Sequence, residues 1–113
     1  MEAGVYNLTI KGKLFKKRAT VDFSRCDKIV KGVLKVGEKA RHSYEVNGKY
    51  DNNRLEFYGS YVVWKPHFVT VSNCTVNGNT FDGDIEFNGK KKKVHGELAA
   101  PVEPVVDDEL AAE

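Results

Sequence analysis

The side chains best suited to catalysis or metal binding are few and far apart in this sequence. The chain has 3 histidines and 2 cysteines among its 113 residues. They are Cys26, Cys74, His42, His67 and His95. Metal sites that can be recognised from sequence usually include a close pair such as Cys-x-x-Cys or His-x-x-x-His. Because no such pair occurs here, we expect no metal site, no bound cofactor and no nucleophile–base relay.

The carboxylates offer no clearer catalytic pattern. Asp82, Asp84 and Glu86 alternate with other residues, so they share one face of a single expected strand. That position is typical of a solvated face, whereas acid–base catalysis needs carboxylates in contrasting environments. The sequence also contains no phosphate-cradling glycine loop and no nucleophile elbow. It therefore favours a protein that is not an enzyme.

Clustered lysines are the feature best able to bind a partner. One cluster lies within residues 11–18, and the other is the run of residues 90–93. Clustered cations bind phosphate backbones, and single-strand binding adds exposed aromatic rings, for which Tyr58 is a candidate. Lysine beside a hairpin is equally a device against edge-to-edge pairing of sheets. The residues expected to form a basic partner-binding surface are Lys13, Lys16, Lys17, Arg18, Lys90, Lys91, Lys92 and Lys93.

The net charge of +2 hides an uneven distribution. Residues 1–100 contain all 18 lysines and arginines and 11 of the 16 acids, which is a net charge of +7. Residues 101–113 contain the other five acids and no base. We expect residues 1–100 to form one domain and residues 101–113 a flexible tail, because Pro101 and Pro104 lack the N–H that a sheet requires. The acidic run of the tail, Asp107, Asp108 and Glu109, is a second candidate for partner binding.

The pattern of residues 5–98 has a period of two, which predicts strands. Turn signals separate the runs; Asn77-Gly78 and Asn88-Gly89 are the strongest, because both central residues of a type I′ turn need a positive φ. Asn47-Gly48 keeps the phase of its neighbours and so belongs inside a strand, which puts the turn at residues 51–53. About eight consecutive antiparallel strands result, and closing them into an up-and-down barrel removes an aggregation-prone edge.

The interior of such a barrel is a third candidate site. With about eight strands it is either filled by side chains or just wide enough for one small ligand. Aromatic residues in the middle third of the chain would suit a small apolar ligand, and a solid aromatic core is the alternative. The candidate lining residues are Tyr44, Tyr50, Phe57, Tyr61, Trp64 and Phe68.

The sequence predicts a cytoplasmic protein. Residues 1–6 have neither a basic start nor an apolar stretch, so we expect no secretory signal. No segment approaches the roughly 20 apolar residues of a membrane-spanning helix. In a reducing compartment Cys26 and Cys74 are expected to be free thiols.

Three short motifs carry a resemblance that covers about residues 3–98. They are Gly4-Val5-Tyr6, Gly48-Lys49-Tyr50 and Asn77-Gly78-Asn79-Thr80. Their order resembles the calycin group of lipocalins and fatty-acid-binding proteins, and within it the GrlR-type repressors of type III secretion regulation. The resemblance implies a small barrel that binds a regulatory protein, partly through an acidic surface loop. The position aligned with that loop, Asp51-Asn52-Asn53-Arg54, is not acidic here.

The sequence thus predicts a non-catalytic binding or regulatory module. Its expected partner is another protein, engaged through the basic surface, the acidic tail or both. A calycin-type binder of a small apolar ligand is the first alternative, and a nucleic-acid-binding basic barrel is the second.

Overall fold

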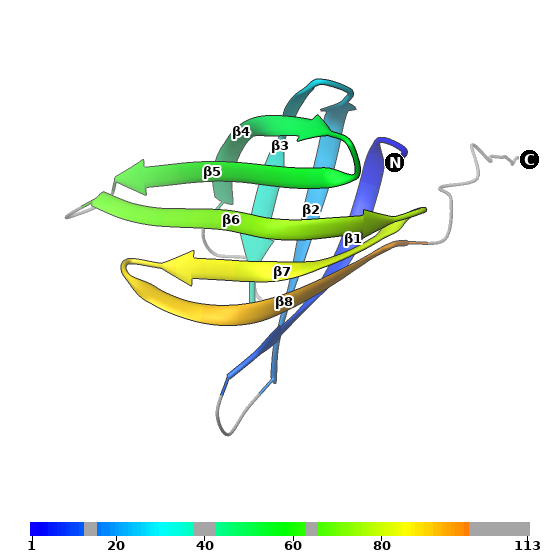
Figure 1. The fold of residues 1–113 in the computed structure, drawn as a ribbon. Helices are drawn as coiled ribbons and strands as arrows, with labels where there is room; N and C mark the ends of the chain where they lie inside the picture. The colour runs from blue at the N-terminus through cyan, green and yellow to red at the C-terminus, as the bar shows by residue number, and fades with distance from the viewer. Residues whose placement is uncertain (13–15, 38–42, 63–65, 100–113) are drawn as a thin grey trace, which may run out of the picture.

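A computed structural model of the protein describes residues 1–12, 16–37, 43–62 and 66–99. Its strands are β1 (Gly4–Lys11), β2 (Lys16–Cys26), β3 (Ile29–Val36), β4 (Ser43–Asp51), β5 (Arg54–Val62), β6 (Pro66–Asn77), β7 (Thr80–Phe87) and β8 (Lys90–Leu98). Each strand pairs antiparallel with the next, and β1 also pairs with β8, so the sheet closes into a barrel (Figure 1). The predicted eight-stranded meander is confirmed. The described residues include no helix long and apolar enough to cross a membrane.

Two hairpins close with the predicted asparagine turns. Asn52 and Asn53 have φ values of 51° and 62°, and Asn88 and Gly89 have 46° and 90°. Positive φ at both central residues is the requirement of a type I′ turn, whose twist matches that of the flanking strands. The turns predicted at residues 51–53 and 88–89 are therefore confirmed.

The turn between β6 and β7 differs from the prediction. Asn77 pairs with Thr80, so the two central residues are Gly78 and Asn79, one residue later than expected. Of these two, Gly78 has a positive φ of 65° and Asn79 does not. These signs are those of a type II′ turn, in which glycine takes the first central position.

The inward-facing side chains pack the barrel. The rings of Tyr6, Phe23 and Phe57 follow one another with centroids 5.5 and 5.4 Å apart, and Phe81 lies 5.9 Å from Tyr6. All four rings are at most 1% exposed, and such contacts add to the stabilisation that comes from burial. The Tyr6 hydroxyl donates to the Glu2 carbonyl oxygen over 2.5 Å, and burial raises the pKa of Tyr6 to about 12.

The residues predicted to line the barrel fall into three groups. Tyr44 and Phe57 are buried, and Tyr50 packs against the same core. Phe68 was expected inside, and that prediction is wrong, because its ring is 55% exposed. The buried neighbours of Phe68 in β6 occupy the inward phase, so Phe68 faces outward. The remaining two predicted positions, the side chain of Tyr61 and the whole of Trp64, lie outside the described residues.

The β1–β2 hairpin extends beyond the rest of the barrel. The β1–β8 ladder ends at the pair Lys11–Lys93, and the β2–β3 ladder begins only at Ala19–Val36. The β1–β2 ladder continues to Lys11–Lys16. Figure 1 shows this hairpin leaving the barrel below β8. Among the described residues, the part of β8 that precedes Lys93 therefore pairs with β7 alone.

Candidate functional site

The four lysines of residues 90–93 alternate between the outer face of β8 and its inward phase. Lys91 and Lys93 lie on the outer face, opposite outward-facing residues of β7. Lys90 and Lys92 lie in the inward phase where β8 begins, at the end of the barrel. Lysines therefore occupy both sides of the strand at the point where β1 leaves it.

Three lysines stand side by side across β2, β1 and β8. Lys11 of β1 lies directly opposite Lys16 on one side and Lys93 on the other. Neighbouring strands are about 4.8 Å apart, and like charges directly opposite one another destabilise a sheet. A bound anion would offset this repulsion, so the row favours anion binding.

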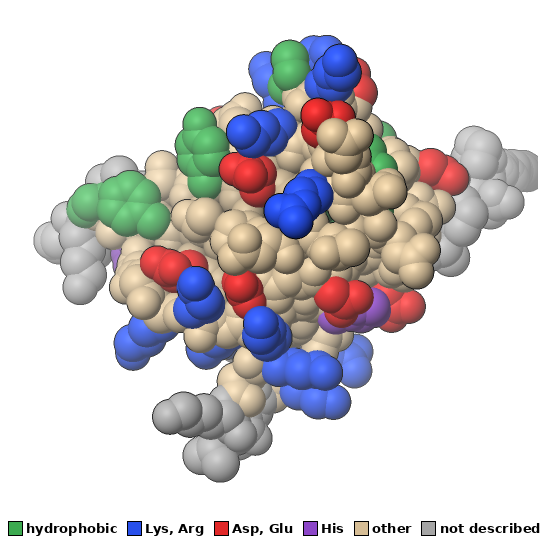
Figure 2. All heavy atoms as spheres, viewed as in Figure 1, with side chains coloured by type: hydrophobic (Ala, Val, Ile, Leu, Met, Phe, Trp, Pro, Cys, Tyr) green, Lys and Arg blue, Asp and Glu red, His purple; other side chains and the backbone are tan. Residues whose placement is uncertain are grey.

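A groove of about 890 Å³ lies where β1 and β8 separate. Its lining consists of Lys11, Gly12, Asp84 and residues 90–93, and we call this set the basic groove. Figure 2 shows lysine and arginine side chains gathered along the lower side of the molecule, the region occupied by β8 and the β1–β2 hairpin in Figure 1.

Asp84 is an anion that the fold itself supplies to the basic groove. Its carboxylate accepts a hydrogen bond from Lys93 Nζ over 2.9 Å and another from Asn73 Nδ2 over 3.2 Å. The bond from Lys93, followed by that from Asn73, holds the pKa of Asp84 below its usual range. Asp84 lies on the outward face but is only 9% exposed, so the expectation that its carboxylate is solvated is wrong.

A β-bulge in β6 explains how Asn73 reaches Asp84. The register between β6 and β7 shifts between Ser72 and Thr75, and Asn73 has a φ of 56°. A bulge inserts an unpaired residue into a strand and redirects its side chain. Gly83 of β7 accommodates the bulge, because a Cβ there would lie 2.4 Å from Cys74 Sγ.

Replacing Asp84 with asparagine is expected to remove part of the pH dependence of folding. Because folding lowers the pKa of Asp84, the carboxylate stabilises the native state above the ordinary aspartate pKa of about 3.9. That stabilisation is lost as the pH falls through the lowered native value. The free energy of unfolding should therefore differ between wild type and Asp84→Asn at about pH 7, and the difference should shrink toward pH 2. Urea titrations measure it, and a difference that does not change with pH would contradict the lowered pKa.

The outward carboxylates of β7 each face a base on β8. His95 Nδ1 lies 2.6 Å from an Asp82 carboxylate oxygen, and Glu86 stands directly opposite Lys91. The Asp84 pair described above lies between them. The outer wall thus carries an acidic stripe on β7 beside a basic stripe on β8.

Two exposed aromatic rings lie beyond the acidic stripe. Tyr58 of β5 is 63% exposed, and Phe68 of β6 is 55% exposed. A row of directly opposed residues runs from Tyr58 through Thr70 and Glu86 to Lys91. The path from the exposed Tyr58 ring to Lys91 therefore crosses three strand spacings of about 4.8 Å each and passes a carboxylate.

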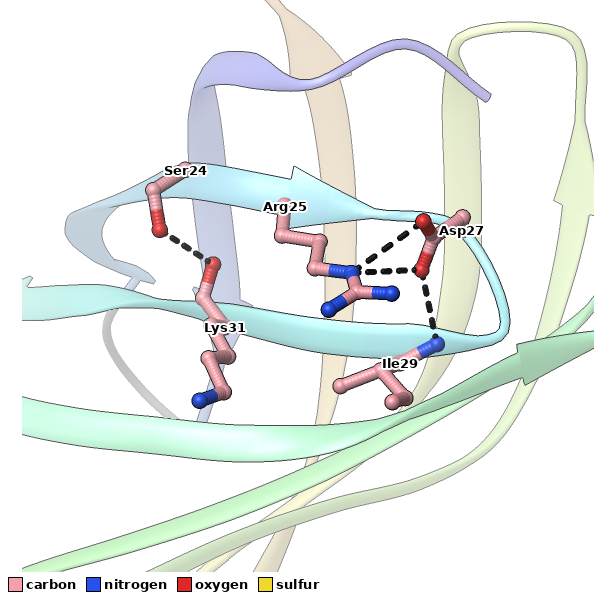
Figure 3. A network of polar contacts seen from close by, with 5 residues as sticks. All are labelled: Ser24, Arg25, Asp27, Ile29 and Lys31. Carbon is pink, nitrogen blue, oxygen red and sulfur yellow. Dashed lines mark hydrogen bonds and ion pairs between the residues drawn. The ribbon is translucent and has the colours of Figure 1, made fainter.

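The turn between β2 and β3 holds a second group of charges, which a carboxylate ties together (Figure 3). Arg25 Nε donates to both Asp27 oxygens over 2.9 and 3.1 Å, and the Ile29 N–H donates to Asp27 Oδ1 over 2.9 Å. The bond from Ile29, followed by that from Arg25, lowers the pKa of Asp27. Nearby, Ser24 Oγ donates to the Lys31 carbonyl oxygen over 3.3 Å. These bonds stabilise the turn between β2 and β3, and none of the residues that form them lines the basic groove.

The structure brings most of the predicted basic residues into one region. Lys16 is exposed on β2 directly opposite Lys11 of the groove, whose lining includes residues 90–93. Lys17 and Arg18 are exposed further along β2, opposite Ile10 and Thr9. Lys13 lies outside the described residues, as do the acidic tail residues Asp107, Asp108 and Glu109. Four groove residues or groove partners were not among the predicted site residues: Lys11, Gly12, Asp84 and Asn73.

The reactive side chains of the described segments are dispersed. In those segments no group of three or more His, Cys, Asp or Glu side chains could hold a metal ion. Cys26 and Cys74 are free thiols. Burial raises the pKa of both, that of Cys74 to about 12, so little reactive thiolate forms at neutral pH.

The strand order defines the class of fold. An eight-stranded antiparallel meander that closes on itself is an up-and-down barrel, and it is consistent with a calycin-like architecture. No family model matches the chain, and no curated protein or solved structure matches it either. The fold class rests on the strand order and register alone, and the resemblance to the GrlR-type repressors stays a prediction.

Proposed function

We propose that this barrel is a non-catalytic binding module that engages an acidic segment of a protein partner through the basic groove. The observation that carries the proposal is the row Lys16–Lys11–Lys93, in which like charges stand directly opposite one another. Asp84 offsets part of this repulsion through its ion pair with Lys93, and a bound anion would offset the rest. A complementary charge on the partner would also steer the encounter and fix its orientation.

The charge pattern favours a protein partner over a nucleic acid. A nucleic acid needs cations along its backbone and, when single-stranded, aromatic rings for its bases. Here the exposed ring of Tyr58 is separated from Lys91 by the acidic stripe on β7, where Glu86 would repel a phosphate backbone. Adjacent stripes of opposite sign suit a protein surface, which can present both charges.

The small-ligand alternative has less support. The rings of Tyr6, Phe23, Phe57 and Phe81 occupy the barrel interior and are at most 1% exposed. Binding an apolar molecule there would require these side chains to move out of a packed core, and densely packed cores resist such rearrangement.

The resemblance to the GrlR-type repressors supports a protein partner but suggests a different contact. In that family the barrel binds a regulatory protein partly through an acidic loop. The aligned position here is a tight turn centred on Asn52 and Asn53, both with positive φ. In that family the barrel contributes negative charge to the contact, whereas a contact through the basic groove would contribute positive charge.

The proposal is tested with a short peptide that has glutamate at alternate positions and with a single-stranded oligonucleotide of similar length. We expect the peptide to bind the full chain, and its affinity to fall as salt rises from about 50 to 200 mM because charges near the surface are screened. We expect weaker binding of the oligonucleotide. Tighter binding of the oligonucleotide, or no binding of the peptide at low salt, would contradict the proposal.

A further inference from the structure

The backbone hydrogen bonds of β8 alternate between its two neighbours. The Ala99 N–H donates to the Val5 carbonyl oxygen over 2.8 Å, on the β1 side. The Leu98 N–H donates to the Asn79 carbonyl oxygen over 2.9 Å, on the β7 side. Neither the β1–β8 ladder nor the β7–β8 ladder contains a register shift. The alternation therefore continues along β8, and its odd-numbered residues direct their N–H and C=O groups toward β1.

Lys91 is an odd-numbered residue of β8, so its N–H and C=O groups also point toward the β1 side, but it lies beyond the end of the β1–β8 ladder. The β1–β8 ladder ends at the pair Lys11–Lys93. In the part of the chain that the structure describes, no residue of β1 stands opposite Lys91. On its other side Lys91 stands opposite Glu86, in a pair that exchanges no backbone hydrogen bonds. Among the described residues, the N–H and C=O groups of Lys91 therefore have no strand partner on the β1 side, where Lys91 lines the basic groove.

A sheet edge of this kind binds extended peptide, because main-chain hydrogen bonds add the peptide as a further strand. The positive charges around this edge favour a peptide with acidic side chains. A carboxylate opposite Lys91 would lie on the outer face, about 6.6 Å along β8 from Lys93, which is paired with Lys11 of β1. The intervening side chains would face Lys90 and Lys92, at the end of the barrel.

We propose that the acidic segment of the protein partner binds as an added strand beside β8, with its backbone paired to Lys91 and its carboxylates on the lysines of the basic groove. This inference rests on the proposed function, and it adds the mode of binding. It assigns Lys91 two separable contributions, a backbone N–H and a side-chain charge.

Two substitutions at one position separate these contributions. Lys91→Gln removes the charge and keeps the N–H, whereas Lys91→Pro removes both. Because the Lys91 N–H does not bond to β7, proline at this position leaves the β7–β8 hydrogen bonds in place. We expect the alternating glutamate peptide to bind Lys91→Pro about fivefold more weakly than Lys91→Gln, which corresponds to one lost hydrogen bond. Equal affinities in two folded variants would overturn strand addition, although the proposed function would stand if both still bound.

A second measurement uses the wild-type chain and does not depend on the folding of the proline variant. Amide hydrogen exchange followed by NMR should show that the Lys91 N–H exchanges more slowly when the peptide is bound. A peptide methylated on its backbone nitrogens should lose this protection and most of its affinity. Unchanged exchange at Lys91 with saturating peptide would overturn the inference, and failure of the unmodified peptide to bind would overturn both it and the proposed function.

Discussion

Gly48→Ala is expected to lower the free energy of unfolding by about 3 kcal/mol and the melting temperature by about 12 °C or more. A Cβ at this position would lie 1.9 Å from the Glu56 carbonyl oxygen and 2.5 Å from Phe57 Cα. Both atoms belong to the backbone of β5, which pairs with β4 at this point, so neither can rotate away. The two strands would have to separate at this point. Thermal and urea unfolding measure the loss.

A glycine in a turn provides the control for this prediction. Gly78 has a φ of 65° but no atom within 4 Å of the position of an added Cβ. Gly78→Ala therefore introduces backbone strain without a clash, and about 1 kcal/mol is expected. If Gly78→Ala were as destabilising as Gly48→Ala, the close approach of β4 and β5 would not be the reason for glycine at residue 48.

Much of the fold follows from local patterns in the sequence. Alternation of apolar and polar residues specifies which side chains face the core, because successive residues of a strand point to opposite sides. The phase through Asn47 and Gly48 places them inside β4, and the structure confirms this. Asparagine and glycine at the turns supply the positive φ that two-residue hairpins need. With every strand joined to the next by a short connection, closure is the arrangement that leaves no edge.

The errors at Phe68 and Asp84 have different origins. Phe68 was grouped with the lining residues by its aromatic character, although its alternation with Val69 and the rest of β6 places it outside. That signal was present in the sequence. Asp84 is different, since it has the phase of a solvated residue and is buried by contacts with Asn73 and Lys93. These contacts depend on a bulge in β6, which alternation within β7 does not reveal.

The basic groove was predicted only in part for a similar reason. Its lysines come from two clusters that are far apart in the sequence, at the two ends of the barrel domain. They meet because the first and last strands pair, which the predicted closure implies. The register that sets Lys11 opposite Lys93, and the point at which β1 leaves β8, depend on the packing of the whole barrel.

Neutralising the basic groove is expected to weaken binding of the alternating glutamate peptide by about 100-fold, since each charged contact contributes about 1 kcal/mol or more. The variant combines Lys11→Gln, Lys91→Gln and Lys93→Gln. Removing the repulsion between Lys11 and Lys93 offsets the lost contact of Lys93 with Asp84, so the variant should remain folded. The matched control combines Lys31→Gln, Lys35→Gln and Lys49→Gln, which remove the same charge from exposed positions on β3 and β4.

The affinity of these two triple variants for the same peptide, at one salt concentration, is the most direct test of the claim that the separation of β1 from β8 creates the binding site. We expect the groove variant to lose most of its affinity. The β3–β4 variant should bind within about threefold of wild type, because it changes only screened long-range charge. Equal losses in the two variants would mean that the peptide responds to total charge, and the basic groove would then have no special role.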